Sequence, residues 1–188
     1  MRKTAVTSVE VHPVIAERWS PRAFDASAVV KADDLTAILE AGRWAPSAFN
    51  GQPWRYLVAQ RGDAKFATIS ATLSGFNQEW APKASALIVA SAVTVNPEGN
   101  PIPTAIFDLG LSVGLMVVEA HHLGYHIHQM AGFDRDALKS AFGFTDELHP
   151  VVVLALGVAG DASTLTNDQL KEREVAPRER KPLSEILL

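Results

Sequence analysis

Residues Ala86 to Val95 read ALIVASAVTV, an apolar run that contains β-branched and small side chains but no charged residue. A second run, Val151 to Val158, reads VVVLALGV and has the same character. Uniformly apolar runs of this length are typical of strands that are buried on both faces of a sheet. Segments with helical periodicity stand around both runs, so the sequence predicts an α+β or α/β fold in three layers.

Hydrophobic periodicity and turn residues locate the remaining elements. The expected helices lie at 11–17, 35–42, 64–73, 104–123 and 135–142, and the other expected strands lie at 54–60 and 125–131. The helix at 104–123 is the most apolar, and its Gly110 and Gly114 lie on one face, where they would let another backbone approach closely. Because such a helix must be covered on most sides, we expect it at the centre of a homodimer.

Length and composition indicate one globular domain over residues 1–188. The chain is 47% hydrophobic and 20% charged, and its formal net charge is −4, which argues against a nucleic-acid partner. It has no cysteine, so thiol nucleophiles, disulfides and iron–sulfur clusters are excluded and any redox chemistry needs a bound cofactor. No apolar stretch resembles a signal peptide, and the run from Ile106 to Val118 is short for a bilayer. We therefore expect a cytoplasmic protein without a membrane partner.

Two basic groups stand near the two ends of this slightly acidic chain. The first reads Arg18-Trp19-Ser20-Pro21-Arg22, and the second reads Arg178-Glu179-Arg180-Lys181. Arg presents its donors in a fork that matches phosphate oxygens, so the two groups together suggest a phosphate monoester held where the termini meet. Solvated surface arginines are the alternative for either group taken alone.

A loop rich in helix-breaking residues, APSAFNGQP, runs from Ala45 to Pro53. Its Asn50 and Gln52 carry both amide donors and amide acceptors between prolines that limit backbone freedom. Such side chains could bind the polar edge of a heterocycle, although a rigid turn before a strand would have the same composition.

Four histidines, His121, His122, His126 and His128, raise the question of a metal site. The first two are adjacent on a helix and point in different directions, and no carboxylate or thiol accompanies them at ligand spacing. We therefore expect no metal and a core or supporting role for these imidazoles. A dinucleotide-binding fingerprint is also missing, because the glycines of the chain lack the required spacing after a strand.

These motifs, in this order, make the chain resemble the flavin-dependent nitroreductase family over nearly its whole length. The motifs are Arg-x-Ser-x-Arg at 18–22, the loop and Trp54 at 45–54, Phe76-Asn77, the segment GYHIHQMAGFD at 124–134, and Arg178-x-Arg180. The resemblance implies an α+β fold, with a central, mostly antiparallel sheet flanked by helices, and an intertwined homodimer. One departure concerns the basic residue that some relatives carry shortly after the Asn, because Gln78, Glu79 and Trp80 occupy that stretch here.

The same resemblance implies that FMN binds at two sites on the dimer interface. One subunit would contribute Arg18, Trp19, Ser20 and Arg22. The other would contribute Pro46, Ser47, Ala48, Asn50 and Gln52. Arg178 and Arg180 would clamp the phosphate, Asn77 would bond the polar edge of the ring, and Met130, Ala131 and Gly132 would lie by its redox-active side. Phe76, Trp80 and His128 would line the substrate pocket.

The function implied is an FMN-dependent oxidoreductase that takes hydride from NAD(P)H and reduces nitroaromatic, quinone or enal acceptors by a ping-pong mechanism. The flavin would carry the chemistry without a catalytic side-chain acid or base, and Arg22 would stabilise the reduced, anionic flavin. Two other functions remain open on the sequence: a flavin-dependent oxygenase or dehalogenase on the same scaffold, and a non-catalytic FMN-binding or storage protein.

Overall fold

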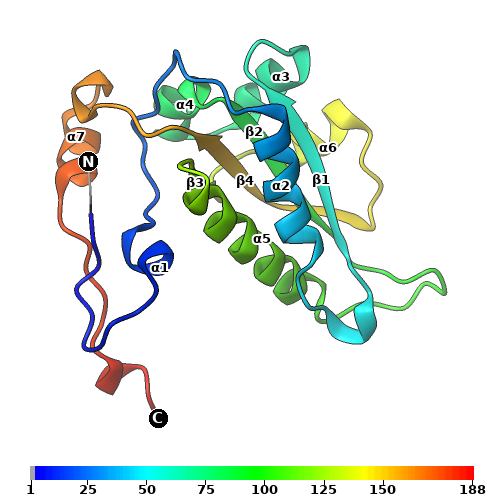
Figure 1. Ribbon diagram of the computed structural model, residues 1–188. Helices are drawn as coiled ribbons and strands as arrows, with labels where there is room; N and C mark the ends of the chain where they lie inside the picture. Colours follow the sequence, from blue (N-terminus) through cyan, green and yellow to red (C-terminus); the bar gives the residue numbers. More distant parts are fainter. Residues whose placement is uncertain (1–2) are drawn as a thin grey trace.

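A four-stranded sheet forms the centre of the protein, which is described over residues 3–188 by a computed structural model (Figure 1). The strands are β1 (Trp54–Gln60), β2 (Ala86–Val93), β3 (His126–Met130) and β4 (Leu148–Gly157). Their order is β1-β2-β4-β3, and every pairing is antiparallel. The two apolar runs therefore form the middle strands, and the prediction of an α+β fold with a central antiparallel sheet is confirmed.

Alternate side chains of the middle strands enter two separate hydrophobic cores, because successive residues of a strand point to opposite faces. On β2, Ile88 and Ala90 belong to the core on one face, whereas Leu87 and Val89 belong to the core on the other. All four side chains are fully buried. This double burial explains why the run lacks the polar alternation of a strand with one solvated face.

The first core lies under α2 (Ala32–Arg43) and α5 (Ala105–His122) (Figure 1). The two helices pack closely at Gly42, where an added Cβ would lie 2.7 Å from Cγ of Met116. By length and composition α5 could cross a membrane, but 44% of it is buried inside the protein, and it packs on α2 and the sheet as a core helix does.

The second core lies under α3 (Ala64–Thr72), α4 (Asn77–Trp80) and α6 (Arg135–Phe142). Phe66 and Ile69 from α3 and Leu138 from α6 are buried there against the second face of β2 and β4. Asp134 caps α6 by accepting a hydrogen bond from the amide of Ala137, as expected for an N-cap aspartate. The structure thus has three layers, as the sequence predicted.

The two ends of the chain run side by side, away from the sheet (Figure 1). The N-terminal end carries α1 (Pro13–Glu17), and the C-terminal end carries α7 (Asp168–Val175). The sequence reading gave no element after Asp161, so α7 was missed. Asn167 begins it by accepting hydrogen bonds from the amides of Gln169 and Leu170. Short 3-10 turns complete the structure at Ala48–Asn50, Ala81–Lys83, Ala162–Thr164 and Leu183–Glu185.

One face of α5 remains uncovered in the single chain. Ile106, Phe107 and Val118 are 51%, 68% and 37% exposed. A Cβ added at Gly110 or Gly114 would meet no described atom within 4 Å. The expectation that these glycines admit a neighbouring backbone is therefore not met within this chain, because they face outward.

Candidate functional site

A cavity of about 260 Å³ lies between the two ends of the chain and is lined mainly by cationic side chains. Its N-terminal wall comes from the segment before β1, and its C-terminal wall follows α7. The lining residues are Lys3, Arg18, Trp19, Ser20, Arg22, Arg173, Ala176, Pro177, Arg178, Glu179 and Arg180. The two arginine groups that the sequence singled out therefore meet, although about 150 residues separate them.

Hydrogen bonds to the backbone fix the two walls against each other. Nη1 of Arg178 donates to the carbonyl oxygens of Lys3 and Ala16 at 2.8 and 2.6 Å, which ties the C-terminal segment to α1. On the other wall, Nη2 of Arg18 donates to Oγ of Ser20 at 3.2 Å, and that hydroxyl donates to the side chain of Gln129 on β3 at 3.3 Å. The cavity is thus anchored to the edge strand of the sheet.

The electrostatics of the cavity favour an anionic ligand. Burial lowers the pKa of Arg18, and the nearby positive charges of Arg178 and Arg180 lower it further. Burial likewise lowers the pKa of Arg178, with Arg180 adding to the effect. Nε of Arg18 is buried and has no hydrogen-bond partner among residues 3–188. Because neighbouring guanidinium groups repel one another, the cluster favours a ligand with negatively charged oxygens.

Lys3 and Trp19 belong to this site, and Lys3 was missed by the sequence reading. The Lys3 ammonium lies 4.6 Å from the centre of the Trp19 ring, a cation–π contact. Burial lowers the pKa of Lys3, whereas the Glu174 carboxylate opposes this shift. Trp19 lines the cavity but is only 8% exposed, so most of its surface is buried.

Glu174 on α7 is a second residue that the sequence reading missed. Its carboxylate is 2% exposed and accepts hydrogen bonds from the backbone amides of Arg22 and Ala23, with N···O distances of 2.9–3.0 Å. The Arg22 guanidinium lies 4.0 Å from the same carboxylate. In the sequence, Glu174 is one charged residue in the polar stretch KEREV at 171–175. The local pattern therefore gives no indication that its side chain contacts Arg22.

The C-terminal end of β3 brings together another part of the predicted site. Nδ2 of Asn77 donates to the carbonyl oxygen of Gly132 at 3.1 Å, and an added Cβ at Gly132 would lie 3.1 Å from that amide nitrogen. Met130 is buried, whereas Ala131 is exposed. Gln129 contacts Ser20, and Gly132 contacts Asn77. Three residues of extended chain span about 10 Å, so this is roughly the separation of the two contacts along the chain.

The three expected pocket residues differ in burial: Trp80 is buried, His128 is partly buried and Phe76 is exposed. Trp80 is 1% exposed in the second core and therefore does not line a channel that is open in this chain. The ring of His128 lies 4.5 Å from Trp80, and its Nδ1 lies 2.9 Å from the carbonyl oxygen of Pro21. Burial lowers the pKa of His128 to about 4, so the imidazole is neutral. Phe76, in contrast, is 40% exposed.

The loop that holds Pro46, Ser47, Ala48, Asn50 and Gln52 lies beyond the end of α2, on the side of the molecule away from α7 (Figure 1). These residues do not join the cationic cavity of their own chain. Three residues of this loop have positive φ values, which non-glycine residues rarely adopt: 51° at Phe49, 56° at Asn50 and 45° at Gln52. Such strain persists only where surrounding contacts impose it, and it concentrates at functional loops.

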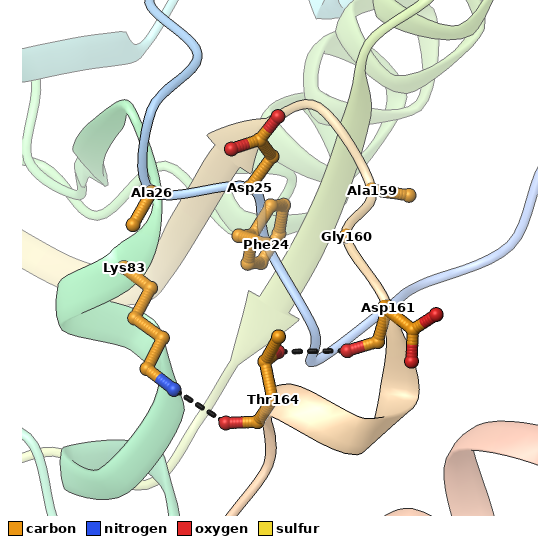
Figure 2. A pocket seen from close by; sticks show the side chains of 8 residues that line it. All are labelled: Phe24, Asp25, Ala26, Lys83, Ala159, Gly160, Asp161 and Thr164. Atoms are coloured by element: carbon orange, nitrogen blue, oxygen red, sulfur yellow. Dashed lines mark hydrogen bonds between the residues drawn. The ribbon is translucent and has the colours of Figure 1, made fainter.

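A larger cavity of about 570 Å³ lies beside residues 24–26 of the N-terminal segment (Figure 2). It is lined by Phe24, Asp25, Ala26, Lys83, Ala159, Gly160, Asp161 and Thr164. Figure 2 shows the Lys83 amino group directed at Thr164, whose carbonyl oxygen it donates to at 2.6 Å. Its cation is therefore already engaged, and the two aspartates leave no net positive charge for a phosphate. The smaller cavity is the better candidate.

Comparison with known proteins decides the family. The sequence profile described as the nitroreductase family matches residues 15–74 and 62–158. The chain belongs to the nitroreductase family. A crystal structure described as an oxidoreductase containing FMN superimposes with a TM-score of 0.92 at 35% identity, covering 98% of this chain and 93% of that one.

Two curated nitroreductase relatives agree with this placement. A Bacillus subtilis protein whose name assigns it to the NAD(P)H nitroreductases, YdgI, is 28% identical over 186 residues, 79% of this chain and 88% of its own. An oxygen-insensitive NAD(P)H nitroreductase of Enterobacter cloacae is 33% identical over 88 residues, which are 46% of this chain and 41% of that protein. The resemblance stated from the sequence motifs is thereby confirmed at the level of the family.

Proposed function

We propose that the protein is a homodimeric, FMN-dependent oxidoreductase that uses NAD(P)H to reduce small conjugated acceptors. The observation that carries this proposal is the cationic cavity built from both chain ends, in which Arg18, Arg22, Arg178 and Arg180 meet. The structural relative that is 35% identical is described as containing FMN, and the two curated relatives carry the name NAD(P)H nitroreductase.

The residues of the chain fit the two ends of FMN. Arg18, Ser20, Arg22 and the pair Arg178 and Arg180 would hold the phosphate, each charge-assisted hydrogen bond contributing about 1.5–3 kcal/mol. Further along β3, Asn77 and the segment from Met130 to Gly132 would lie at the ring. The order of these groups along β3 matches a ligand with a phosphate at one end and a flat heterocycle at the other.

The second half of each site would come from the other subunit. Phe49, which lies in the loop from Ala45 to Pro53, is 106% exposed, and Trp44, which directly precedes that loop, is 74% exposed. The outward face of α5 with Gly110 and Gly114 offers an apolar surface that a second copy could cover. Phe107→Glu, placed on that face, is expected to convert a dimer into a monomer in sedimentation velocity. A wild-type chain that sediments as a monomer would contradict this assembly.

A bound flavin would supply the redox chemistry, namely hydride acceptance from NAD(P)H and electron donation to nitroaromatic, quinone or enal acceptors in alternating half-reactions. The chain contributes binding, orientation and field. Arg22, half-buried and held beside the Glu174 carboxylate, would supply positive charge at the phosphate end of the cofactor. The half-exposed Phe76 would form one wall of the acceptor pocket, and apolar walls of this kind discriminate weakly between substrates. A cytoplasmic location suits this dependence on NAD(P)H.

Anaerobic reduction tests the proposal directly. Protein saturated with FMN is mixed with NADH or NADPH, and the flavin absorbance near 450 nm is followed before a panel of acceptors is added. We expect at least one nicotinamide to bleach the flavin and an acceptor to restore the colour. A yellow protein that neither nicotinamide reduces would favour a storage protein. A chain that gains no thermal stability from FMN would overturn the proposal.

A further inference from the structure

Glu174 occupies the point at which the two walls of the cationic cavity meet. Both of its carboxylate oxygens accept a hydrogen bond from the backbone amide of Arg22, and Oε1 also accepts one from the backbone amide of Ala23. At 2% exposure the side chain cannot reach a ligand in the cavity. Its role must therefore be exerted through the residues that it holds.

The segment that Glu174 holds is fixed from the opposite side by the end of the sheet. The amide of Gly160 donates to the carbonyl oxygen of Ala23 at 2.7 Å, and the amide of Asp25 donates to that of Val158 at 2.9 Å. The last of these contacts lies beside the cavity of Figure 2, where Phe24 and Gly160 pack closely. Residues 22–25 are thus bonded to α7 on one side and to the segment that follows β4 on the other. The backbone from which the Arg22 side chain extends is therefore fixed.

Charge gives Glu174 a second effect. It favours the protonated forms of both Lys3 and Arg22, against burial and against repulsion from neighbouring cations. Arg178 and Arg180 follow α7 directly, so the helix that carries Glu174 also sets the position of the C-terminal wall. One buried carboxylate consequently orients the N-terminal arginines and connects them to the C-terminal ones.

We propose that Glu174 is the positioning residue of the phosphate end of the site, and that it sets the preference for FMN over riboflavin, which lacks the phosphate. This inference rests on the proposed flavin function. A purely through-space effect would act in the opposite direction, because a negative charge near the cavity repels phosphate. The cavity is open to solvent, which screens that repulsion, whereas the hydrogen bonds to Arg22 and Ala23 are buried and local.

Glu174→Gln separates these effects. The amide keeps one acceptor oxygen but places an NH₂ group against the amide of Arg22, so the local geometry is disturbed while the volume is kept. Glu172→Gln is the matched control, because Glu172 is exposed on the same helix. Dissociation constants for FMN and for riboflavin are measured by flavin fluorescence with flavin-free protein, together with the melting temperature of each variant.

We expect Glu174→Gln to weaken FMN binding at least about tenfold and to leave riboflavin binding unchanged, whereas Glu172→Gln changes neither. Equal weakening of both flavins would mean a merely structural role. Unchanged FMN binding would mean that Glu174 does not position the phosphate ligands, and tighter FMN binding would mean that its charge dominates; each result overturns the inference. If Glu174→Gln does not fold, Glu174→Asp, which keeps the charge on a shorter side chain, is measured by the same two ligands with the same criteria. A wild-type chain that binds neither flavin would instead refute the proposed function.

Discussion

Replacing Asp108 by alanine tests whether a buried carboxylate holds the strained loop before β1. Asp108 lies on α5 and is 3% exposed. Its Oδ2 accepts hydrogen bonds from the amide of Ala48 at 3.2 Å and from the hydroxyl of Thr104 at 3.1 Å. The first of these bonds reaches into the turn where Phe49 and Asn50 have positive φ values.

The expected loss follows from these contacts. Hydrogen bonds to a charged acceptor contribute about 1.5–3 kcal/mol each. Each backbone outlier stores strain on the order of 1–3 kcal/mol, which the loop would release once it is freed. The Ala48 amide is half-buried and can turn to water, so the net loss should be about 1.5–3 kcal/mol in the free energy of unfolding. For a chain of this length that corresponds to a fall in melting temperature of roughly 5–10 °C.

Thermal unfolding and amide hydrogen exchange of the flavin-free protein measure the two consequences separately. Asp108→Ala should lower the melting temperature and accelerate exchange at the amides of residues 48–52, whereas Asp108→Asn, which keeps one acceptor, should lie between it and wild type. Glu98→Gln, an exposed acid in another loop, is the control for lost charge. Wild-type exchange at these amides in Asp108→Ala would refute the view that the carboxylate holds the loop.

Three further predictions concern single side chains. Arg22→Ala should raise the dissociation constant for FMN by one to three powers of ten, about 1.5–4 kcal/mol, in a fluorescence titration; unchanged retention would show that Arg22 does not hold the cofactor. Gly42→Ala places a Cβ 2.7 Å from Cγ of Met116 and should lower the free energy of unfolding in urea by about 1–3 kcal/mol, a loss that vanishes only if Met116 can move aside. Burial lowers the pKa of His126 from 6.5 to about 4, and the charge of the neighbouring His121 adds to the shift. The stability that the neutral imidazole contributes is therefore complete above pH 6.5 and is lost as pH falls towards 4. At about 1.4 kcal/mol per unit, His126→Phe should remove about 3 kcal/mol of this acid-side loss, and an unchanged pH profile of stability would contradict the shift.

The sequence predicted those parts of the fold that depend on local pattern. Uniform apolar runs identified β2 and β4 as middle strands, because only a strand buried on both faces can dispense with polar alternation. Amphipathic periodicity likewise located α2 and α6. Boundaries were less certain, and β4 begins at Leu148 rather than at Val151, since pairing with β2 continues through His149 and Pro150.

Contacts between distant segments were not predictable in the same way. The pairing of Glu174 with Arg22 joins residues 152 positions apart, and the anchoring of Ala48 by Asp108 joins a loop to the middle of a helix. The sequence around Glu174 or Asp108 is the same whether the carboxylate is buried or exposed to solvent. The outward direction of Gly110 was equally hidden, because helical spacing defines a face without saying what covers it.

The cationic cavity has a different energetic basis from the two cores. On α7 only Leu170 and Glu174 are buried, so the C-terminal wall gains little from apolar packing. The walls are held by Glu174 and by the hydrogen bonds of Arg178, while repulsion among the arginines opposes their approach. An anion bound between the walls would remove this repulsion and stabilise only the docked arrangement. Binding of such an anion and the docking of the two chain ends would therefore strengthen each other. Substitutions in the two walls could change this coupling without any change in the hydrophobic cores.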